Sequence, residues 1–339
     1  MKTFSKYLTD FFAKYLCEEK GVSKHTLRSF GETFSLLLMY FHDAKKINAD
    51  KLMLSNINRE EVLAFLTWLE TTRRCSTSTR NQRLAAIHSF CKYIMYEDVK
   101  LLDQWSNILK IKFKKTIQAE MNYLCIEAIK ILLELIPQDT RDGRRDLALI
   151  SLLYDSGARV QGLCDLTPKS LDLISPEYVT LLGKGNKSRN VPLQKEQVAI
   201  LKRYVEENRL DRDDRNMRAL FFNKQGGHLT PAGVTYILNK YFKCAKEKNP
   251  NLFPDKFSPH CMRHSKAMHL LQGGINLIYI RDILGHVQSS TTEVYARADS
   301  KQKREALELA YSNVLPVPSG NASWDDDSEL RNWLKGLGK

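Results

Sequence analysis

The stretch that decides the fold is SPHCMRHSKAMHLLQGG, residues 258–274. Ser258 stands where a helix cap is expected, and Pro259 suits the first position of a helix. His260 and Arg263 are three residues apart, so they lie on one face of the predicted helix. This segment therefore presents an imidazole and a guanidinium group together.

A second segment, LGHVQSSTTEVYAR, follows at residues 284–297. It places His286 directly after a glycine turn and Tyr295 on a further predicted helix. Ser290 and Glu293 have the spacing of a capping box at the start of that helix. Taken singly, a capped histidine or a half-buried tyrosine has an ordinary structural explanation.

Two segments upstream carry further basic side chains. In SLLYDSGARVQGLCDL, residues 151–166, Arg159 lies just beyond a glycine turn at the start of a helix. In YVTLLGKGNKSRNVPL, residues 178–193, strand-like runs from Tyr178 to Leu182 and from Ser188 to Leu193 flank a Gly-Asn turn. This pattern predicts a β-hairpin with Lys184 at the end of its first strand.

Together these segments supply the groups that a metal-free phosphoryl transfer needs. Two guanidinium groups can hold the nonbridging oxygens of a phosphodiester and stabilise its five-coordinate transition state, where a metal ion otherwise acts. The sequence therefore predicts a phosphoryl-transfer site without a metal or other cofactor. Its six candidate residues are Arg159, Lys184, His260, Arg263, His286 and Tyr295.

The composition suits a protein that acts on nucleic acid. The chain of 339 residues has 52 Lys and Arg against 39 Asp and Glu, a net charge of +13 that favours a polyanionic partner. Its seven scattered cysteines form no CxxC pair, so neither a disulfide framework nor a zinc site is indicated. The N-terminal segment has charges every few residues, and no stretch is apolar enough to cross a membrane. We therefore expect a cytoplasmic protein.

The chain length suits two domains with an added tail. Residues 1–108 have the 3–4 spacing of helices, residues 109–120 are expected to form a basic linker, and residues 121–315 a second domain. Arg80 and Arg83, one helical turn apart, are our candidates for the DNA major groove. Four lysines in or beside the linker are candidates for phosphate contacts: Lys110, Lys112, Lys114 and Lys115.

Residues 316–339 are expected to form a flexible connector followed by a short helix. Ser323 and Asp326 suit a capping box, and the acidic residues 325–327 suit the positive end of a helix. Leu330, Trp333, Leu334 and Leu337 form an apolar stripe that needs a receiving surface. This surface could belong to the protein's own second domain or to a neighbouring subunit.

The order and spacing of these motifs resemble the tyrosine recombinases, or phage integrases, in particular Xer-like and transposon-borne members. Twenty-five residues separate Arg159 from Lys184, and nine separate His286 from Tyr295. The resemblance implies a mainly α fold. It consists of a helical N-terminal core-binding domain of SAM-like type and an α-rich catalytic domain with a small antiparallel β-sheet, which together form a C-shaped clamp on DNA.

The resemblance also implies the roles of the residues. Tyr295 would be the nucleophile that forms a 3′-phosphotyrosyl link, Lys184 the acid that protonates the leaving 5′-hydroxyl, and Arg159 and Arg263 the phosphate clamp. His260 and His286 would assist proton transfer. The implied partners are double-stranded DNA with inverted-repeat core sites, three further copies of the chain in a synaptic tetramer, and accessory directionality proteins. The protein would then act at the nucleoid and not at a membrane.

One position departs from the family pattern. An acidic residue is common three positions after the first arginine, and this chain has Gly162 there. Asp165, one turn farther on, is our candidate substitute that orients Arg159 or a histidine.

Two other functions stay open at this point: a catalytically idle DNA-binding protein, and a type IB topoisomerase that relaxes supercoils. For a recombinase, the reaction itself remains open among integration, excision, resolution and transposition.

Overall fold

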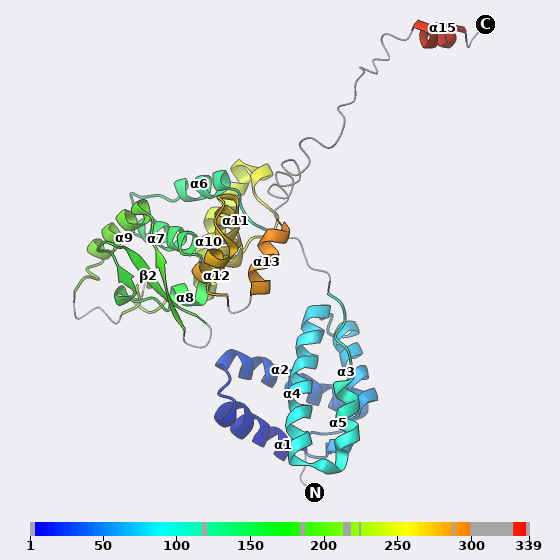
Figure 1. Cartoon of the computed structure of the whole chain (residues 1–339). Coiled ribbons are helices and arrows are strands. Elements are labelled where there is room, and N and C mark those ends of the chain that lie inside the picture. Colours follow the sequence, from blue (N-terminus) through cyan, green and yellow to red (C-terminus); the bar gives the residue numbers. More distant parts are fainter. Residues whose placement is uncertain are drawn as a thin grey trace. The chain divides into compact units, whose positions relative to one another are not determined.

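The computed structural model describes residues 4–116, 121–183, 187–212, 218–223, 225–286, 289–298 and 328–336 (Figure 1). The chain divides into two compact units, Met1–Ala119 and Glu120–Lys339. The predicted mainly helical fold with one small antiparallel sheet is confirmed. Each unit has a hydrophobic core of its own.

The N-terminal unit is helical throughout its regular structure (Figure 1). Three of its helices are capped, since the side chains of Ser23, Asn58 and Ser76 each accept a hydrogen bond from a backbone N–H in the first turn of the helix they begin. The α-helices are α1 Phe4–Asp10, α2 Lys24–Lys45, α3 Arg59–Thr71, α4 Thr77–Glu97 and α5 Leu102–Leu109.

The first helix of the chain extends well beyond α1. It continues from α1 as a π-helical stretch, Phe11–Glu19, before the chain turns at Gly21 with a φ of +54°. The ring of Phe11 lies 5.9 Å from that of Phe34 and 5.3 Å from that of Phe90. These edge-on aromatic contacts join the first helix to α2 and α4.

The second unit contains the predicted hairpin within a three-stranded antiparallel sheet of order β1-β2-β3. Strands β2 Tyr178–Leu182 and β3 Ser188–Pro192 pair so that Val179 lies opposite Val191. Both valines are buried, as the alternation of apolar residues predicts for a half-buried strand. The short strand β1, Leu171–Asp172, is an addition that the sequence did not indicate.

Helix α7, Arg141–Asp155, lies in the interior of the second unit, and its apolar residues are buried on nearly every side. Its neighbours include α9 Lys195–Glu207 and α11 Pro259–Gln272, which both pack against it. The remaining helices with described bounds are α6 Ile126–Glu134, α8 Val160–Cys164, α10 Pro231–Lys248, α12 Leu277–Leu284, α13 Ser289–Ala298 and, in the tail, α15 Ser328–Gly336.

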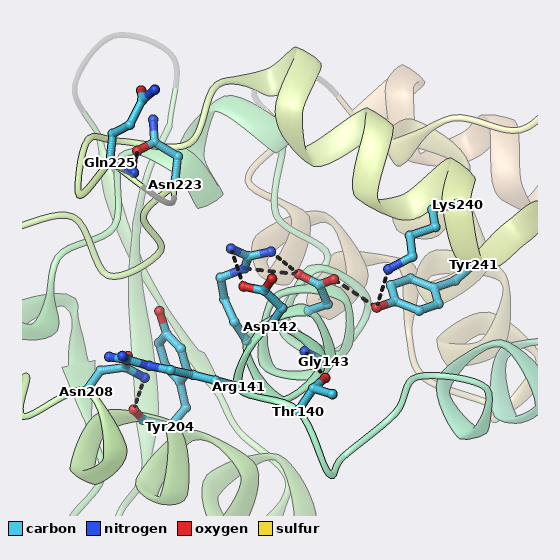
Figure 2. Close-up of polar contacts among 12 residues, drawn as sticks. Thr140, Arg141, Asp142, Gly143, Tyr204, Asn208, Asn223, Gln225, Lys240 and Tyr241 are labelled. Carbon is cyan, nitrogen blue, oxygen red and sulfur yellow. Dashed lines mark hydrogen bonds and ion pairs between the residues drawn. The ribbon is translucent and has the colours of Figure 1, made fainter.

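A polar network fixes the start of α7 (Figure 2). The Thr140 hydroxyl caps the helix by accepting from the backbone N–H of Gly143, and the Arg141 guanidinium donates to the Asn208 side chain at 2.8 Å. On the next turn, Asp146 accepts a 2.8 Å hydrogen bond from the hydroxyl of Tyr241. These bonds fix the first turns of the buried helix. Its C-terminal end leads directly into the turn at Gly157, which precedes Arg159.

Gly157 is a position that requires glycine. Its φ is +56°, and an added Cβ would lie 2.8 Å from Cδ2 of Leu284. Gly162, in contrast, is helical, and its added Cβ would meet only the Leu182 carbonyl oxygen at an ordinary 3.5 Å. The two glycines therefore form a matched pair for substitution.

We expect Gly157→Ala to lower the free energy of unfolding by about 1–3 kcal/mol, because alanine is strained at positive φ and contacts Leu284 too closely. Gly162→Ala should leave stability unchanged or raise it by up to about 1 kcal/mol, since alanine favours a helix. Chemical denaturation of both variants tests this. Equal stabilities for the two variants would contradict the strained conformation assigned to Gly157.

Candidate active site

Helix α11 carries three of the polar side chains at the site. Pro259 occupies the first turn as predicted, but the Ser258 hydroxyl makes no capping bond and instead lies 3.4 Å from Sγ of Cys261. Arg263 is buried with 1% of its surface exposed, whereas His260 is exposed and His264 is half-buried. The expected pairing of an imidazole and a guanidinium on one helix is therefore present, with the guanidinium in the interior.

The Arg263 guanidinium joins two of the other sequence motifs. Its Nη1 donates to the Gly157 carbonyl oxygen and its Nη2 to the Leu284 carbonyl oxygen, both at 2.6 Å. Gly157 begins the turn that leads to Arg159, and Leu284 ends the helix that leads to His286. The buried Arg263 guanidinium therefore binds both the turn that leads to Arg159 and the turn that leads to His286.

Arg159 lies exposed at the N-terminus of α8. Its positive charge adds to the lowering of the pKa values of Arg263 and His260 and opposes the rise that burial causes in the pKa of Tyr295, so these groups share one electrostatic environment. Burial is the larger cause for Arg263, and the combined effects lower its pKa to about 9. Holding these cations together is unfavourable by itself, and an incoming phosphate anion would offset the repulsion.

Tyr295 projects from α13 into a small apolar cluster and has 2% of its surface exposed. Burial raises the pKa of its phenol, while the charges of Arg263 and Arg159 and a hydrogen bond with Arg263 oppose that rise. The phenol oxygen lies 3.1 Å from Nδ1 of His264. The cluster that holds the ring comprises Ala267, Met268, Leu271, Ile280 and Leu284.

His286 and His260 complete the described part of the site. The His286 ring lies parallel to that of Tyr295, with centroids 6.2 Å apart, and its Nδ1 is 2.9 Å from the Thr292 hydroxyl. Burial and the charge of Arg263 lower the pKa of His286 to about 4. The pKa of His260 is also lowered, first by loss of solvation and then by Arg263 and Arg159. Both rings are therefore neutral at pH 7.

Five of the six candidate residues are thus close together. Lys184 lies outside the described residues, as does the turn of the hairpin that carries it. Helix α13 begins at Ser289, and because the side chain of Ser290 lies outside what the structure describes, the predicted capping box of Ser290 and Glu293 stays a prediction. The expected orienting role of Asp165 is not supported. Within the described residues its carboxylate accepts a bond from Gln161 at 2.8 Å, and no bond joins it to Arg159 or a histidine.

Two residues at the site escaped the sequence analysis, His264 and Arg189. Arg189, on β3, donates from Nε to the Ile283 carbonyl oxygen at 2.8 Å, and burial together with the charge of Arg159 lowers its pKa to about 10. His264 follows Arg263 directly and lies one helical turn after His260. That i, i+4 spacing of two histidines was the available signal.

The structure corrects the expectation for Arg80 and Arg83. Arg80 is buried with 4% of its surface exposed, and its Nη1 donates to Asn81 at 3.1 Å. The Arg83 guanidinium donates to the Ser29 carbonyl oxygen and to Glu32. Because both guanidinium groups are bound within the N-terminal unit, neither is presented for a DNA groove.

The segment expected to be a linker is in part packed on the N-terminal unit. Lys110 is the C-cap residue of α5, Ile111 is buried in the core, and the backbone of Lys114 exchanges two hydrogen bonds with the Asn81 side chain. The Lys114 ammonium also pairs with Glu70 at 2.6 Å. All four lysines predicted here are exposed, and Lys112 and Lys115 are the two for whose side chains no bond is described in this segment.

The lowered histidine pKa values predict how stability depends on pH. Burial is the first cause of the pKa of about 4 at both His264 and His286, below the ordinary value of 6.5. Between these values the unfolded chain binds more protons than the folded one, so the free energy of unfolding should fall as the pH drops from about 6.5 to 4.

Thermal unfolding followed over this pH range tests the prediction. A His264→Gln, His286→Gln double variant should lose less stability over the same interval, because it lacks both titrating rings. An unchanged pH dependence in the double variant would contradict the assignment.

No helix among the residues described by the structure is both long and apolar enough to span a bilayer.

The chain matches two protein-family models, the phage integrase family over residues 122–302 and the phage integrase N-terminal SAM-like domain over residues 9–98. It is 31% identical over 309 residues to the tyrosine recombinase XerC of Myxococcus xanthus, covering 90% of this chain and 97% of that protein. It is also 31% identical over 303 residues to the tyrosine recombinase XerD of Oceanobacillus iheyensis, covering 88% and 96%.

Among solved structures, the XerH site-specific recombinase bound to a palindromic difH substrate, in a post-cleavage complex, has a TM-score of 0.65. It is 25% identical to this chain, and the match covers 82% of this chain and 79% of that one. The chain therefore belongs to the phage integrase family and is a tyrosine-type site-specific DNA recombinase.

Proposed function

We propose that Tyr295 is the nucleophile that cuts and rejoins DNA. The observation that carries this proposal is the position of its hydroxyl, 3.1 Å from His264 and close enough to the buried Arg263 for that charge to oppose the rise of the phenol pKa. A tyrosine needs a nearby cation at the phosphate and a nearby proton acceptor to act as a nucleophile at neutral pH. The site supplies both kinds of group.

In the first step, the Tyr295 oxygen bonds to the scissile phosphorus as the bond from phosphorus to the 5′-oxygen breaks. Arg159 and Arg263 stabilise the charge on the nonbridging oxygens, and Lys184 donates a proton to the departing 5′-oxygen. His260 and His286 assist at the phosphate. The phosphotyrosyl link conserves the phosphodiester energy, so attack by a 5′-hydroxyl from a partner strand reseals the DNA without ATP.

The assembly that performs strand exchange follows from this chemistry. We propose that four copies bind double-stranded DNA with inverted-repeat core sites, since two exchanging duplexes offer four cleavage points. The unit with the matched SAM-like domain would bind the core site, and the exposed Lys112 and Lys115 would contact phosphates. Accessory proteins would set the direction. Recombination at the nucleoid places the protein in the cytoplasm.

The same chemistry serves integration, excision, resolution and transposition. These reactions differ in whether the two sites lie on one DNA molecule or on two, and in how the sites are oriented. The site geometry that we describe is common to all four.

The chemistry can be tested on a duplex that carries a nick close to the cleavage point. The short 5′-hydroxyl product then diffuses away, and the covalent adduct accumulates. We expect an adduct, stable to denaturation, in which the protein is joined to the 3′-phosphate at the break, and it should form in EDTA and without ATP. Linkage through a 5′-phosphate, or dependence on a divalent metal, would contradict the proposal.

The tail helix α15 supports a role in assembly. Trp333 and Leu334 of the predicted apolar stripe are exposed, with 61% and 51% of their surfaces accessible. The predicted cap residues Ser323 and Asp326 and the last stripe residue, Leu337, lie outside the described residues. A helix this short is marginally stable in water, so we propose that its apolar face docks on a neighbouring copy.

Deleting residues 320–339 should therefore preserve folding and binding to a single site while it weakens synapsis and recombination. Gel-shift titration and a two-site recombination assay measure the two effects. As a matched control, Trp333→Ala with Leu334→Ala should reproduce the defect without shortening the chain. A truncated protein that recombines at the full rate would show that the tail has no such role.

A further inference from the structure

His264 is the histidine whose ring nitrogen meets the Tyr295 hydroxyl. Its Nδ1 lies 3.1 Å from the phenol oxygen, within hydrogen-bond distance, and the two ring centroids are 5.6 Å apart. The two residues come from α11 and α13, which pack against each other. The contact therefore joins two elements that are fixed in the fold of the catalytic unit.

The other two histidines of the site are placed differently. His286 presents the face of its ring to Tyr295, and its Nδ1 is bonded to Thr292. The His260 ring packs edge-on against His264 at 4.4 Å. Among the described residues, His264 is thus the histidine that forms a hydrogen bond with the attacking oxygen.

The electrostatic environment supports acceptance of a proton by His264. Burial, with smaller contributions from His260 and Arg263, lowers the pKa of His264 to about 4, so the ring is neutral at pH 7. A neutral imidazole with its proton on Nε2 has a free lone pair on Nδ1. A bound phosphodiester would offset the charges of the arginines and raise the pKa of His264 toward the range of an efficient base.

We propose that His264 accepts the proton of Tyr295 during strand cleavage. As the bond between the phenol oxygen and phosphorus forms and the bond to the 5′-oxygen breaks, the phenol proton moves to Nδ1 of His264. The departing 5′-oxygen takes its proton from Lys184. Resealing reverses both transfers, so the site ends in its starting protonation state. This inference rests on the proposed role of Tyr295 as the nucleophile.

The test is single-turnover cleavage of the nicked duplex by full-length variants. His264→Ala should slow adduct formation by about 10²–10⁴-fold, the usual effect of losing a general base. His264→Asn should be slowed as strongly, because an amide oxygen near the Nδ1 position accepts a hydrogen bond but cannot take up the proton. Binding to the duplex, measured by gel shift, should stay unchanged in both.

A fluorinated tyrosine at position 295 separates proton transfer from positioning. Fluorine lowers the phenol pKa, so an ionised side chain no longer needs a proton acceptor. In the His264→Ala or His264→Asn background, this substitution should recover at least about tenfold in rate. In the wild-type background it should bring no such gain.

A matched control is His269→Ala, on the same helix. It removes an equivalent hydrogen bond between a histidine and a tyrosine, here with the Tyr154 hydroxyl at 2.8 Å and not with Tyr295. The folded control should cleave at close to the wild-type rate.

Three results would overturn the proton-acceptor role: cleavage by His264→Ala at the wild-type rate, full activity of His264→Asn, or no recovery with the fluorinated tyrosine. If His264→Ala does not fold, the Asn variant provides the same comparison. An adduct that still forms with Tyr295→Phe would instead refute the nucleophile itself, so the two failures are distinguishable.

Discussion

Tyr295→Phe is expected to bind its DNA site as the wild-type protein does and to form no covalent adduct. Phenylalanine keeps the ring that packs among the apolar residues of α11 and α12, so the fold should be preserved. It lacks the oxygen that attacks phosphorus, so cleavage should fall below detection. A labelled nicked duplex on a denaturing gel measures the adduct, and a native gel measures binding.

The matched control for this variant is Tyr279→Phe. Tyr279 lies on α12 with 66% of its surface exposed, outside the apolar cluster that holds Tyr295. The control should form the adduct at the wild-type rate. If Tyr295→Phe still forms the adduct and Tyr279→Phe does not, the nucleophile is Tyr279 on α12.

Arg263→Lys is expected to have the second-largest effect, although it retains a positive charge. A lysine cannot reproduce the fork that donates to the carbonyl oxygens of Gly157 and Leu284 at once. Cleavage should fall by about 10²–10³-fold, as for the loss of one preorganised donor at a transition state. The melting temperature should fall as well, because a buried carbonyl left without a partner costs about 1–3 kcal/mol.

Arg281→Lys provides the comparison for Arg263→Lys. Arg281 lies on α12 and pairs with the exposed Asp282, an interaction of small expected energy. Its replacement should change neither cleavage nor melting by a measurable amount. If Arg263→Lys behaves like Arg281→Lys, Arg263 neither holds the two turns together nor stabilises the transition state.

The sequence predicted the parts of the fold that depend on local pattern. The hairpin over Tyr178–Leu182 and Ser188–Pro192 and the helix that begins at Pro259 are confirmed, because alternation and helix-end residues act over a few neighbours. The motif spacing likewise identified residues that the fold brings together, such as Arg263 and Tyr295.

The errors arose where the outcome depends on segments far apart in the chain. Arg80 has the spacing of a solvent-facing residue, but the chain beyond α5 folds back along α4 and buries it. The bond made by Asp165 has a local cause instead, because the side-chain amide of Gln161, four residues earlier, donates to its carboxylate, and a role of Asp165 toward Arg159 or a histidine stays a prediction. The contact of His264 with Tyr295 was missed because it depends on the packing of α11 against α13, which no local pattern encodes.

The most direct test of the central claim is to identify the residue that carries the DNA. The wild-type protein is trapped on the nicked duplex, digested with nuclease and protease, and the modified peptide is sequenced by mass spectrometry. The account predicts that the added mass lies on Tyr295, within the peptide that contains residues 289–296. A modification on any other residue, such as Tyr279 or a serine, would contradict it.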